Sequence, residues 1–257
     1  MPYQPGDTIL DKYRIEALIG RGAFAEVYHA THVELHVSRA LKVLRRDTAG
    51  VGSSLYDDYK KRFQLEVRLG ARLNHPNVIH VYDVEHDEGA LILVMEYASG
   101  GSLAERMQQK RDHGDRFEIK EALRIGIQVA AGLGKLHELD AVHRDLKPSK
   151  ILFDRDDVAK IADFGLAQIP GGPSMRSQLS QPVRHPGTAG YMSPEQEGTT
   201  GFLKPASDVY ALGLVLFELL TGRNYNYVKP GTTVGALRPE SPACLDDLLA
   251  QMLSKMA

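Results

Sequence analysis

The sequence predicts an α+β fold in which an antiparallel five-stranded sheet precedes a mainly helical half. Short segments of alternating apolar and polar residues, separated by glycine-containing turns, dominate the chain up to about residue 97. A long segment with apolar side chains at helical spacing follows over Phe117–Leu139. A second, strongly apolar helix is predicted from Ser207 to the glycine at position 222. We therefore divide the chain into residues 1–97 and residues 98–257.

Composition narrows the class of protein. The 257 residues include 31 basic and 33 acidic side chains, for a formal net charge of -2, which argues against nucleic-acid or membrane binding through a basic field. Cys244 is the sole cysteine, which excludes an internal disulfide and fits a reducing cytoplasm. The N-terminus has no signal-peptide pattern, and the longest apolar stretch, Val209–Leu220, is too short to span a bilayer. We expect a cytoplasmic domain without a membrane segment.

The first two strands are predicted over Tyr13–Ile19 and Ala25–Thr31, after a polar lead that runs to about Lys12. The loop between them contains Gly20 and Gly22, a spacing that also occurs in dinucleotide-binding folds. A dinucleotide fold needs a helix after the glycines, whereas the segment that follows here is short, partly β-branched and aromatic. The loop is therefore predicted to be the tip of a hairpin whose backbone N–H groups can bind phosphate.

The sheet is completed by three further strands and flanked by one helix. Strands are predicted over Val37–Leu44, Val78–Val84 and Leu91–Glu96. A capping-box pattern starts a helix that covers Ser54–Leu73. Gly70, inside this helix, lowers its stability by roughly 1 kcal/mol relative to alanine. We expect this helix to be unusually mobile.

In the second half, two carboxylates are predicted to lie at one end of a hairpin. The short apolar runs Ile151–Phe153 and Val158–Ile161 flank a polar turn. Asp145 precedes this hairpin, with Lys147 two residues later, and Asp163 follows it directly before Phe-Gly. The unit thus combines carboxylates and cations, the groups that phosphate chemistry requires.

The segment His143–Gly165, HRDLKPSKILFDRDDVAKIADFG, resembles the catalytic loop and the magnesium-binding loop of protein kinases of the serine/threonine type. Ala40-Leu41-Lys42 resembles the kinase element that carries the phosphate-binding lysine, and Gly187–Glu195 resembles the substrate-docking loop and A-P-E element. The resemblance covers about residues 10–257 and is most like bacterial serine/threonine kinases. It implies a bilobal fold with a small lobe over 1–97, a large lobe over 98–257 that stops before the family's final helices, and an ATP cleft between them.

The resemblance also implies catalytic roles. Asp145 is expected to orient the substrate hydroxyl and accept its proton, and Lys147 to steady the transferring phosphoryl group. Thr188 is expected near these two residues, where it helps to select serine or threonine acceptors. Lys42 is expected to bind the α- and β-phosphates and to pair with Glu66. The expected partner is a protein substrate with a serine or threonine acceptor.

The implied cofactors are ATP and Mg²⁺ or Mn²⁺, with the metal on Asp163. The residues expected at the nucleotide are Ile19, Gly20, Arg21, Gly22, Ala23, Phe24, Ala25, Glu26, Val27, Ala40, Lys42, Glu66, Met95, Glu96, Ala98, Leu152 and Asp163. Met95 is expected at the back wall of the pocket, and the backbone of Glu96 and Ala98 at the adenine.

Lys150 departs from the family pattern, because it stands where kinases carry the asparagine that binds a second magnesium ion. A lysine ammonium has three donors and no acceptor, so it cannot bind a metal, and we expect it near Asp163 or Asp145 as a single positive charge. This change is expected to impair transfer. Together with Gly70 and the short C-terminus it leaves a second hypothesis open: a pseudokinase that acts as a nucleotide-binding or scaffolding switch.

Three expectations concern the rest of the large lobe. A phosphate on the segment before Glu195 is expected to be captured by Arg144, with self-association allowing autophosphorylation. The candidate phosphoacceptors are Ser174, Ser177 and Ser180. Asp208, in an apolar run, is expected to hold the backbone of the His-Arg-Asp turn. Glu195 is expected to lack its usual arginine partner, because the chain ends before that position.

Overall fold

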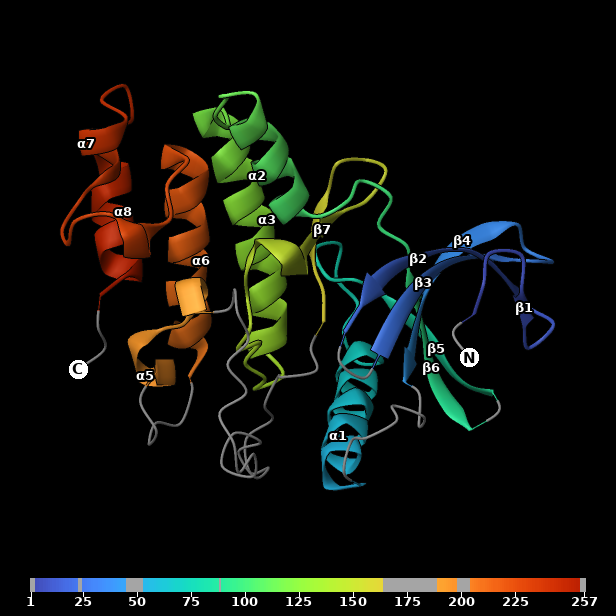
Figure 1. Cartoon of the computed structure of the whole chain (residues 1–257). Coiled ribbons are helices and arrows are strands. Elements are labelled where there is room, and N and C mark those ends of the chain that lie inside the picture. Colours follow the sequence, from blue (N-terminus) through green and yellow to red (C-terminus); the bar gives the residue numbers. More distant parts are fainter. Residues whose placement is uncertain are drawn as a thin grey trace. The chain divides into compact units, whose positions relative to one another are not determined.

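The computed structural model of the protein describes residues 3–22, 25–44, 53–87, 89–163, 189–197 and 204–254. The chain forms two compact units, Met1–Ser99 and Gly100–Ala257, which are described separately (Figure 1). None of the described helices is both long and apolar enough to cross a membrane.

The first unit is an antiparallel sheet with the strand order β1-β2-β3-β4-β6-β5 and one helix, α1 (Figure 1). The strands are β1 (Thr8–Ile9), β2 (Tyr13–Arg21), β3 (Ala25–His32), β4 (Val37–Leu44), β5 (Val81–Asp87) and β6 (Ala90–Glu96), and α1 covers Ser53–Gly70. The predicted antiparallel α+β class is confirmed, with six strands in place of five.

The additional strand, β1, lies in the segment that the sequence indicated to be a polar lead. Thr8 pairs with Arg14 and Ile9 with Tyr13, and the side chain of Ile9 is buried. Leu10 has a left-handed backbone conformation, which turns the chain back into β2. One buried isoleucine among polar residues is too short a pattern to predict a strand, so the sequence missed it.

The two faces of the sheet pack into different clusters because successive side chains of a strand alternate between faces. Leu41 and Val43 of β4 join one cluster with Tyr28, whereas Leu44 of the same strand joins a second cluster with Phe63 of α1. This alternation places Lys42, the neighbour of both buried residues, on the face that carries α1. The sheet therefore directs a cation toward the helix.

Gly70 ends α1 three residues before the predicted end of the helix, and the structure supplies a reason for a glycine at this position. A Cβ atom added to Gly70 would lie 2.9 Å from Cβ of Val81 in β5 and closer still to one of its methyl groups. Real Cβ atoms do not approach so closely, and Val81 is itself buried. The glycine allows the end of α1 to pack directly on β5.

We therefore expect Gly70→Ala to lower the free energy of unfolding. Overpacking of a buried contact costs about 1–3 kcal/mol, which exceeds the roughly 1 kcal/mol that alanine gains in helix propensity. Urea denaturation measures the difference, and the cost should shrink in a Val81→Ala background, where the clashing methyl groups are absent. A rise in stability of the single variant would contradict this account.

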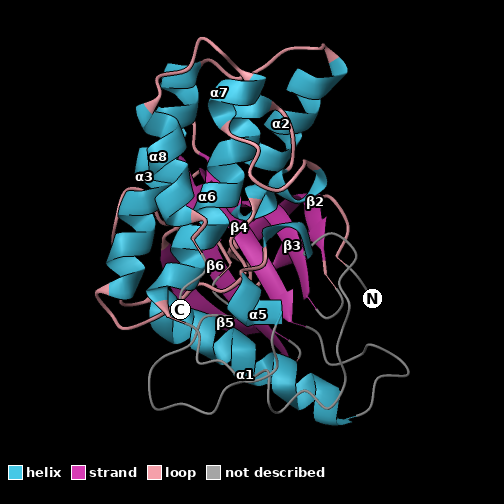
Figure 2. Ribbon diagram, turned by 90° about the vertical axis from the view of Figure 1, so that its left-hand side faces the viewer, coloured by secondary structure: helices cyan, strands magenta, loops and turns pink. Residues whose placement is uncertain are grey.

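The second unit is mainly helical. The helices among its described residues are α2 (Leu103–Asp112), α3 (Ile119–His137), α5 (Pro194–Glu197), α6 (Pro205–Thr221), α7 (Val234–Leu237) and α8 (Cys244–Met252), with 3₁₀ turns η1 (Pro148–Lys150), η2 (Ala189–Tyr191) and η3 (Tyr225–Tyr227). The apolar helix α6 packs against α3, α7 and α8 (Figures 1 and 2). It ends at Gly222, which has the left-handed conformation predicted for a C-terminal cap.

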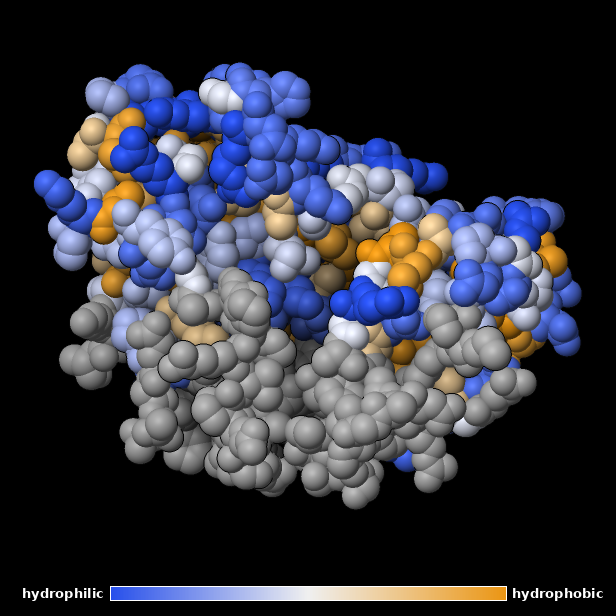
Figure 3. All heavy atoms as spheres, viewed as in Figure 1, coloured by the Kyte–Doolittle hydropathy of each residue, from blue (hydrophilic) through white to orange (hydrophobic). Residues whose placement is uncertain are grey.

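Local sequence explains how the ends of these elements are fixed. Ser102 and Glu105 form a capping box that starts α2, which buries Leu103 and Met107 and exposes mainly polar side chains (Figure 3). The predicted hairpin is present as β7 (Ile151–Phe153) and β8 (Ala159–Ile161). This hairpin carries the residues that the sequence marked for chemistry.

Candidate active site

Lys42 and Glu66 form a buried ion pair inside the first unit. The Lys42 ammonium donates to Glu66 Oε2 over 2.6 Å. The side chain of Glu66 is 3% exposed and that of Lys42 is 15% exposed. The alternation of β4 and the position of Glu66 on α1 bring these charges together, as the kinase resemblance implied. Because each charge compensates the other, removal of either would leave a buried charge without this partner.

The glycine loop is the tip of a hairpin, as predicted. Gly20 pairs with Val27 and Arg21 with Glu26 across β2 and β3, and the Gly22 N–H donates to the Ala25 carbonyl over 2.8 Å. An ion pair of 3.1 Å between the Arg21 guanidinium and Glu26 adds a cross-strand contact. Ala23 and Phe24 lie outside the described residues. The strand after the glycines excludes the dinucleotide-binding alternative.

The residues expected at the adenine lie on and after neighbouring strands of the same unit. Ala40 of β4 lies opposite Met95 of β6, and Met95 also lies opposite Val81 of β5. The Glu96 N–H donates to the His80 carbonyl over 2.8 Å. Any backbone contact of Glu96 with a base therefore has to use its carbonyl group. Ile19 is half exposed on β2, and Ala98 follows β6.

In the second unit, Asp145 is held by a lysine. The Lys147 ammonium lies 3.1 Å from Asp145 Oδ2 and 3.2 Å from Oδ1. Both side chains are largely buried, with 19% of Lys147 and 11% of Asp145 exposed. The fully buried His143 lies between this loop and the strand that leads to Asp163, because its ring contacts the Asp145 N–H and the Ala162 carbonyl. The carboxylate is therefore fixed before any substrate binds.

Asp208 anchors the backbone of this loop, as the sequence predicted. Its two carboxylate oxygens accept from the N–H groups of His143 over 2.8 Å and Arg144 over 2.9 Å. His137 of α3 contacts the same carboxylate over 2.8 Å. Arg144 has a left-handed backbone conformation, which is uncommon for residues other than glycine. The buried carboxylate on α6 stabilises this conformation and so sets the position of Asp145.

Lys150 and Asp163 form a second lysine–carboxylate pair beside the first. The Lys150 ammonium donates to Asp163 Oδ2. The side chains are partly exposed, 23% for Lys150 and 33% for Asp163. Of the two positions left open by the sequence, near Asp163 or near Asp145, the structure shows the first. Asp145 of the catalytic loop thus contacts Lys147, and Asp163, which follows β8, contacts Lys150.

Asp163 and Lys150 differ in their ability to bind a divalent metal. Asp163 offers carboxylate oxygens, the ligands that Mg²⁺ and Mn²⁺ prefer. Lys150 offers only N–H donors and a positive charge. The residues present therefore fit one metal at Asp163, whereas the position of Lys150 does not fit a metal ligand.

The comparisons with known proteins agree with this geometry. A family model described as protein kinase domain matches residues 13–238. The chain belongs to the protein kinase family. It is 36% identical over 218 residues to the serine/threonine-protein kinase PrkC of Bacillus subtilis, with 85% of this chain and 32% of PrkC covered. It is 37% identical over 226 residues to the serine/threonine-protein kinase pkn3 of Myxococcus xanthus, with 84% of this chain and 39% of pkn3 covered.

The fold agrees as well. The crystal structure of the Mycobacterium tuberculosis PknI kinase domain superposes with a TM-score of 0.71 at 27% identity, covering 100% of this chain and 92% of that domain. The predicted resemblance to bacterial serine/threonine kinases is thereby confirmed. The chain spans about a third of the length of the curated relatives that it matches.

Two predictions concern the later part of the kinase domain, one on Glu195 and one on the hydroxyl residues that precede it. No arginine among the described residues contacts Glu195, whose carboxylate instead accepts from the Ser207 hydroxyl over 2.6 Å. Burial raises the pKa of the Glu195 carboxyl group, but hydrogen bonds from the Ser207 hydroxyl, from the backbone of Glu195 itself and from the Ser193 side chain together outweigh burial and lower this pKa. Nothing in the sequence marked Ser207, in the first turn of α6, as the residue that supplies this contact. Thr188, Ser174, Ser177 and Ser180 lie outside the described residues.

Sequence reasoning missed Glu218, a buried carboxylate on α6 beside the catalytic loop. It accepts from the Tyr191 hydroxyl over 2.5 Å and from the Asn224 amide over 3.2 Å, and lies 3.4 Å from the Arg111 guanidinium. Burial and the hydrogen bond to Glu218 raise the pKa of the Tyr191 hydroxyl, which therefore stays protonated. The sequence contained the signal, a carboxylate inside the apolar run Val209–Leu220, but that run was interpreted only for its length relative to a bilayer.

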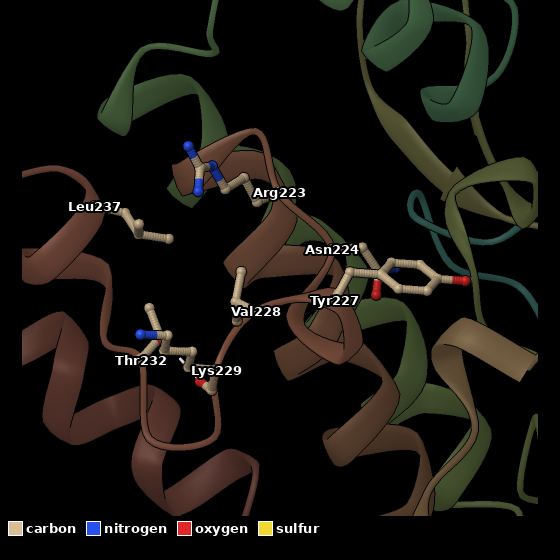
Figure 4. Close-up of a pocket in the computed structure, with 7 residues that line it drawn as sticks. All are labelled: Arg223, Asn224, Tyr227, Val228, Lys229, Thr232 and Leu237. Atoms are coloured by element: carbon tan, nitrogen blue, oxygen red, sulfur yellow. Dashed lines mark hydrogen bonds between the residues drawn. The ribbon is translucent and has the colours of Figure 1, made fainter.

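The described part of the second unit includes a hollow beside the catalytic loop and another away from it. A small one, of about 180 Å³, borders Lys147, Tyr191 and Glu218 and so adjoins the catalytic loop. A larger one, of about 520 Å³, is lined by Arg223, Asn224, Tyr227, Val228, Lys229, Thr232 and Leu237 (Figure 4). Its lining includes none of the predicted site residues, so we do not assign the chemistry to it.

Proposed function

We propose that this kinase domain transfers the γ-phosphoryl group of ATP to serine or threonine hydroxyls of protein substrates. The observation that carries the proposal is the carboxylate of Asp145, held by Lys147 at 3.1 Å on a loop that Asp208 anchors. A carboxylate fixed in this way is suited to orient a hydroxyl and accept its proton. The motif form Asp-Leu-Lys-Pro favours serine and threonine over tyrosine acceptors.

Each remaining residue has a distinct role in the proposal. Lys42, oriented by Glu66, binds the α- and β-phosphates of the nucleotide. Lys147 both positions Asp145 and balances negative charge on the transferring group. Asp163 would hold the divalent cation, which when bound neutralises charge on the phosphate oxygens. The intact pairs of Lys42 and Asp145 favour an enzyme over a purely scaffolding role.

Phosphoryl transfer itself is the direct test. Incubation with γ-labelled ATP, Mg²⁺ or Mn²⁺ and a generic protein substrate should label serine and threonine, whereas Lys42→Met should lose most of the transfer because the phosphates lose their cation. Phosphoamino-acid analysis distinguishes the acceptors. Labelling that is equal in both forms points to a contaminating kinase, and absence of labelling in the wild type refutes the proposal.

Nucleotide binding can be measured apart from chemistry. ATP with Mg²⁺ should raise the unfolding midpoint, because a ligand that binds only the folded state stabilises it. Lys42→Met should show a smaller rise at the same ATP concentration, and Lys135→Met, which removes a partly exposed lysine of α3, should behave as the wild type. No rise with millimolar ATP and either metal would count against nucleotide binding.

The partners in this proposal are protein substrates, including a second copy of the chain. Autophosphorylation is proposed on the segment that contains Ser174, Ser177, Ser180 and Thr188. The intact mass before and after incubation with ATP, followed by peptide mapping, tests it. An unchanged mass in a preparation that labels other proteins would refute autophosphorylation while leaving the kinase activity standing.

A further inference from the structure

The position of Lys150 is fixed by the backbone of the β7–β8 hairpin. Ile151 lies opposite Ile161, and the Ala162 N–H donates to the Lys150 carbonyl over 2.9 Å, which extends the ladder by one residue. A side chain at position 150 therefore lies beside the residues that follow β8, the next of which is Asp163. Asp163 also has a left-handed backbone conformation at φ 70°. The contact between Lys150 and Asp163 is built into the hairpin register.

Each of the two predicted site carboxylates contacts a lysine in this arrangement. Lys147 contacts Asp145, and Lys150 contacts Asp163. A kinase with asparagine in place of Lys150 offers a carbonyl oxygen there for a second Mg²⁺. Lys150 replaces this oxygen with a cation, so a second metal would lose a ligand and meet a like charge.

We propose that the ammonium of Lys150 takes the place of the second metal ion, so that this domain binds its nucleotide with one divalent cation, on Asp163. This inference rests on the proposed function, since it concerns the same nucleotide site. In this proposal one of the two cations at the nucleotide is a side chain of the protein and the other is a bound metal ion. The fixed ammonium supplies one positive charge where a metal supplies two, but it does so at any metal concentration.

Metal stoichiometry tests the inference without reference to turnover. Mn²⁺ binding is followed by the electron paramagnetic resonance signal of free Mn²⁺ in the presence of saturating AMP-PNP, a non-hydrolysable ATP analogue. The wild type should bind one Mn²⁺ per nucleotide complex. Lys150→Asn should bind two, because the amide restores an oxygen ligand and removes the charge. Lys150→Ala should bind one, because it removes the charge but offers no ligand.

The outcomes separate the inference from the proposed function. Two Mn²⁺ in the wild type, or one in Lys150→Asn, would overturn the inference alone. No bound Mn²⁺ in a wild-type nucleotide complex would also overturn it, because Lys150 would then block Asp163 instead of sharing the site. No nucleotide binding in any form would overturn the proposed function. Lys135→Asn, which removes a surface lysine paired with Glu138 on α3, is the matched control and should bind as the wild type.

A second measurement does not require nucleotide. If the Lys150–Asp163 contact exists in the free protein, Lys150→Asn and Asp163→Asn should shift the unfolding midpoint in a non-additive way when combined. Strict additivity would show that the two side chains do not interact, and would overturn the inference at its first step. Midpoints close to that of the wild type also show that the variants used for metal binding are folded.

Discussion

Asp145→Asn should lower the turnover of phosphoryl transfer by about 10²–10⁴-fold, because positioned general bases commonly contribute that much. The asparagine amide keeps the shape of the side chain but cannot accept the proton of the acceptor hydroxyl, and it loses the ion pair with Lys147. Steady-state kinetics with labelled ATP measure kcat and the KM for ATP. We expect kcat to fall, while the KM for ATP changes little because Lys42 is untouched.

The matched control for Asp145→Asn is a substitution in the turn between β7 and β8. Asp156 is exposed, so Asp156→Asn makes the same chemical change without altering the loop that Asp208 anchors. It should leave turnover near the wild-type value. If Asp145→Asn retained wild-type turnover, Asp145 would not be the base, and the proposed mechanism would fail even though the fold were correct.

The contacts that were predicted well are those for which a local sequence pattern and the position of a kinase motif indicate the same pair of groups. Lys42 lies on the face of β4 that α1 covers because strand side chains alternate, and Glu66 lies on that helix. Asp208 was expected to need hydrogen-bond donors because it is a carboxylate in an apolar helix, and the kinase resemblance indicated that the His-Arg-Asp turn supplies them. In each case one local rule and one motif specify the same contact.

The contacts that the sequence did not predict depend on the packing of distant segments. The need for Gly70 becomes visible only when the end of α1 lies against Val81. The pairing of Glu195 with Ser207 likewise joins α5 to the start of α6, and nothing in either segment marks the other as a partner. Both depend on how closely two backbones approach, a quantity that propensity and periodicity do not contain.

The role of Lys150 could be predicted from the sequence only in part. The sequence identified it as a departure from the kinase pattern, and the chemistry of an ammonium excluded metal binding. It left two carboxylates as partners, and only the hairpin register decided between them. The functional consequence that we expect from this register is a change in how the enzyme depends on metal concentration.

At high Mg²⁺, Lys150→Asn should raise turnover by up to about 100-fold, whereas Lys150→Ala should lower it by a similar factor, because one contributor to transition-state charge stabilisation is commonly worth about that much. The asparagine variant gains a divalent cation in place of the single charge of Lys150, and the alanine variant gains nothing in return. At low Mg²⁺, where only one metal is bound, we expect the turnover of the wild type to exceed that of both variants, because its ammonium does not dissociate.

The measurement is kcat for the three forms across a Mg²⁺ titration at saturating ATP. The decisive feature is a crossing of the wild-type and Lys150→Asn curves, since a general effect on folding would displace one curve without changing its metal dependence. Parallel curves for these two forms would mean that Lys150 does not act in place of a metal ion.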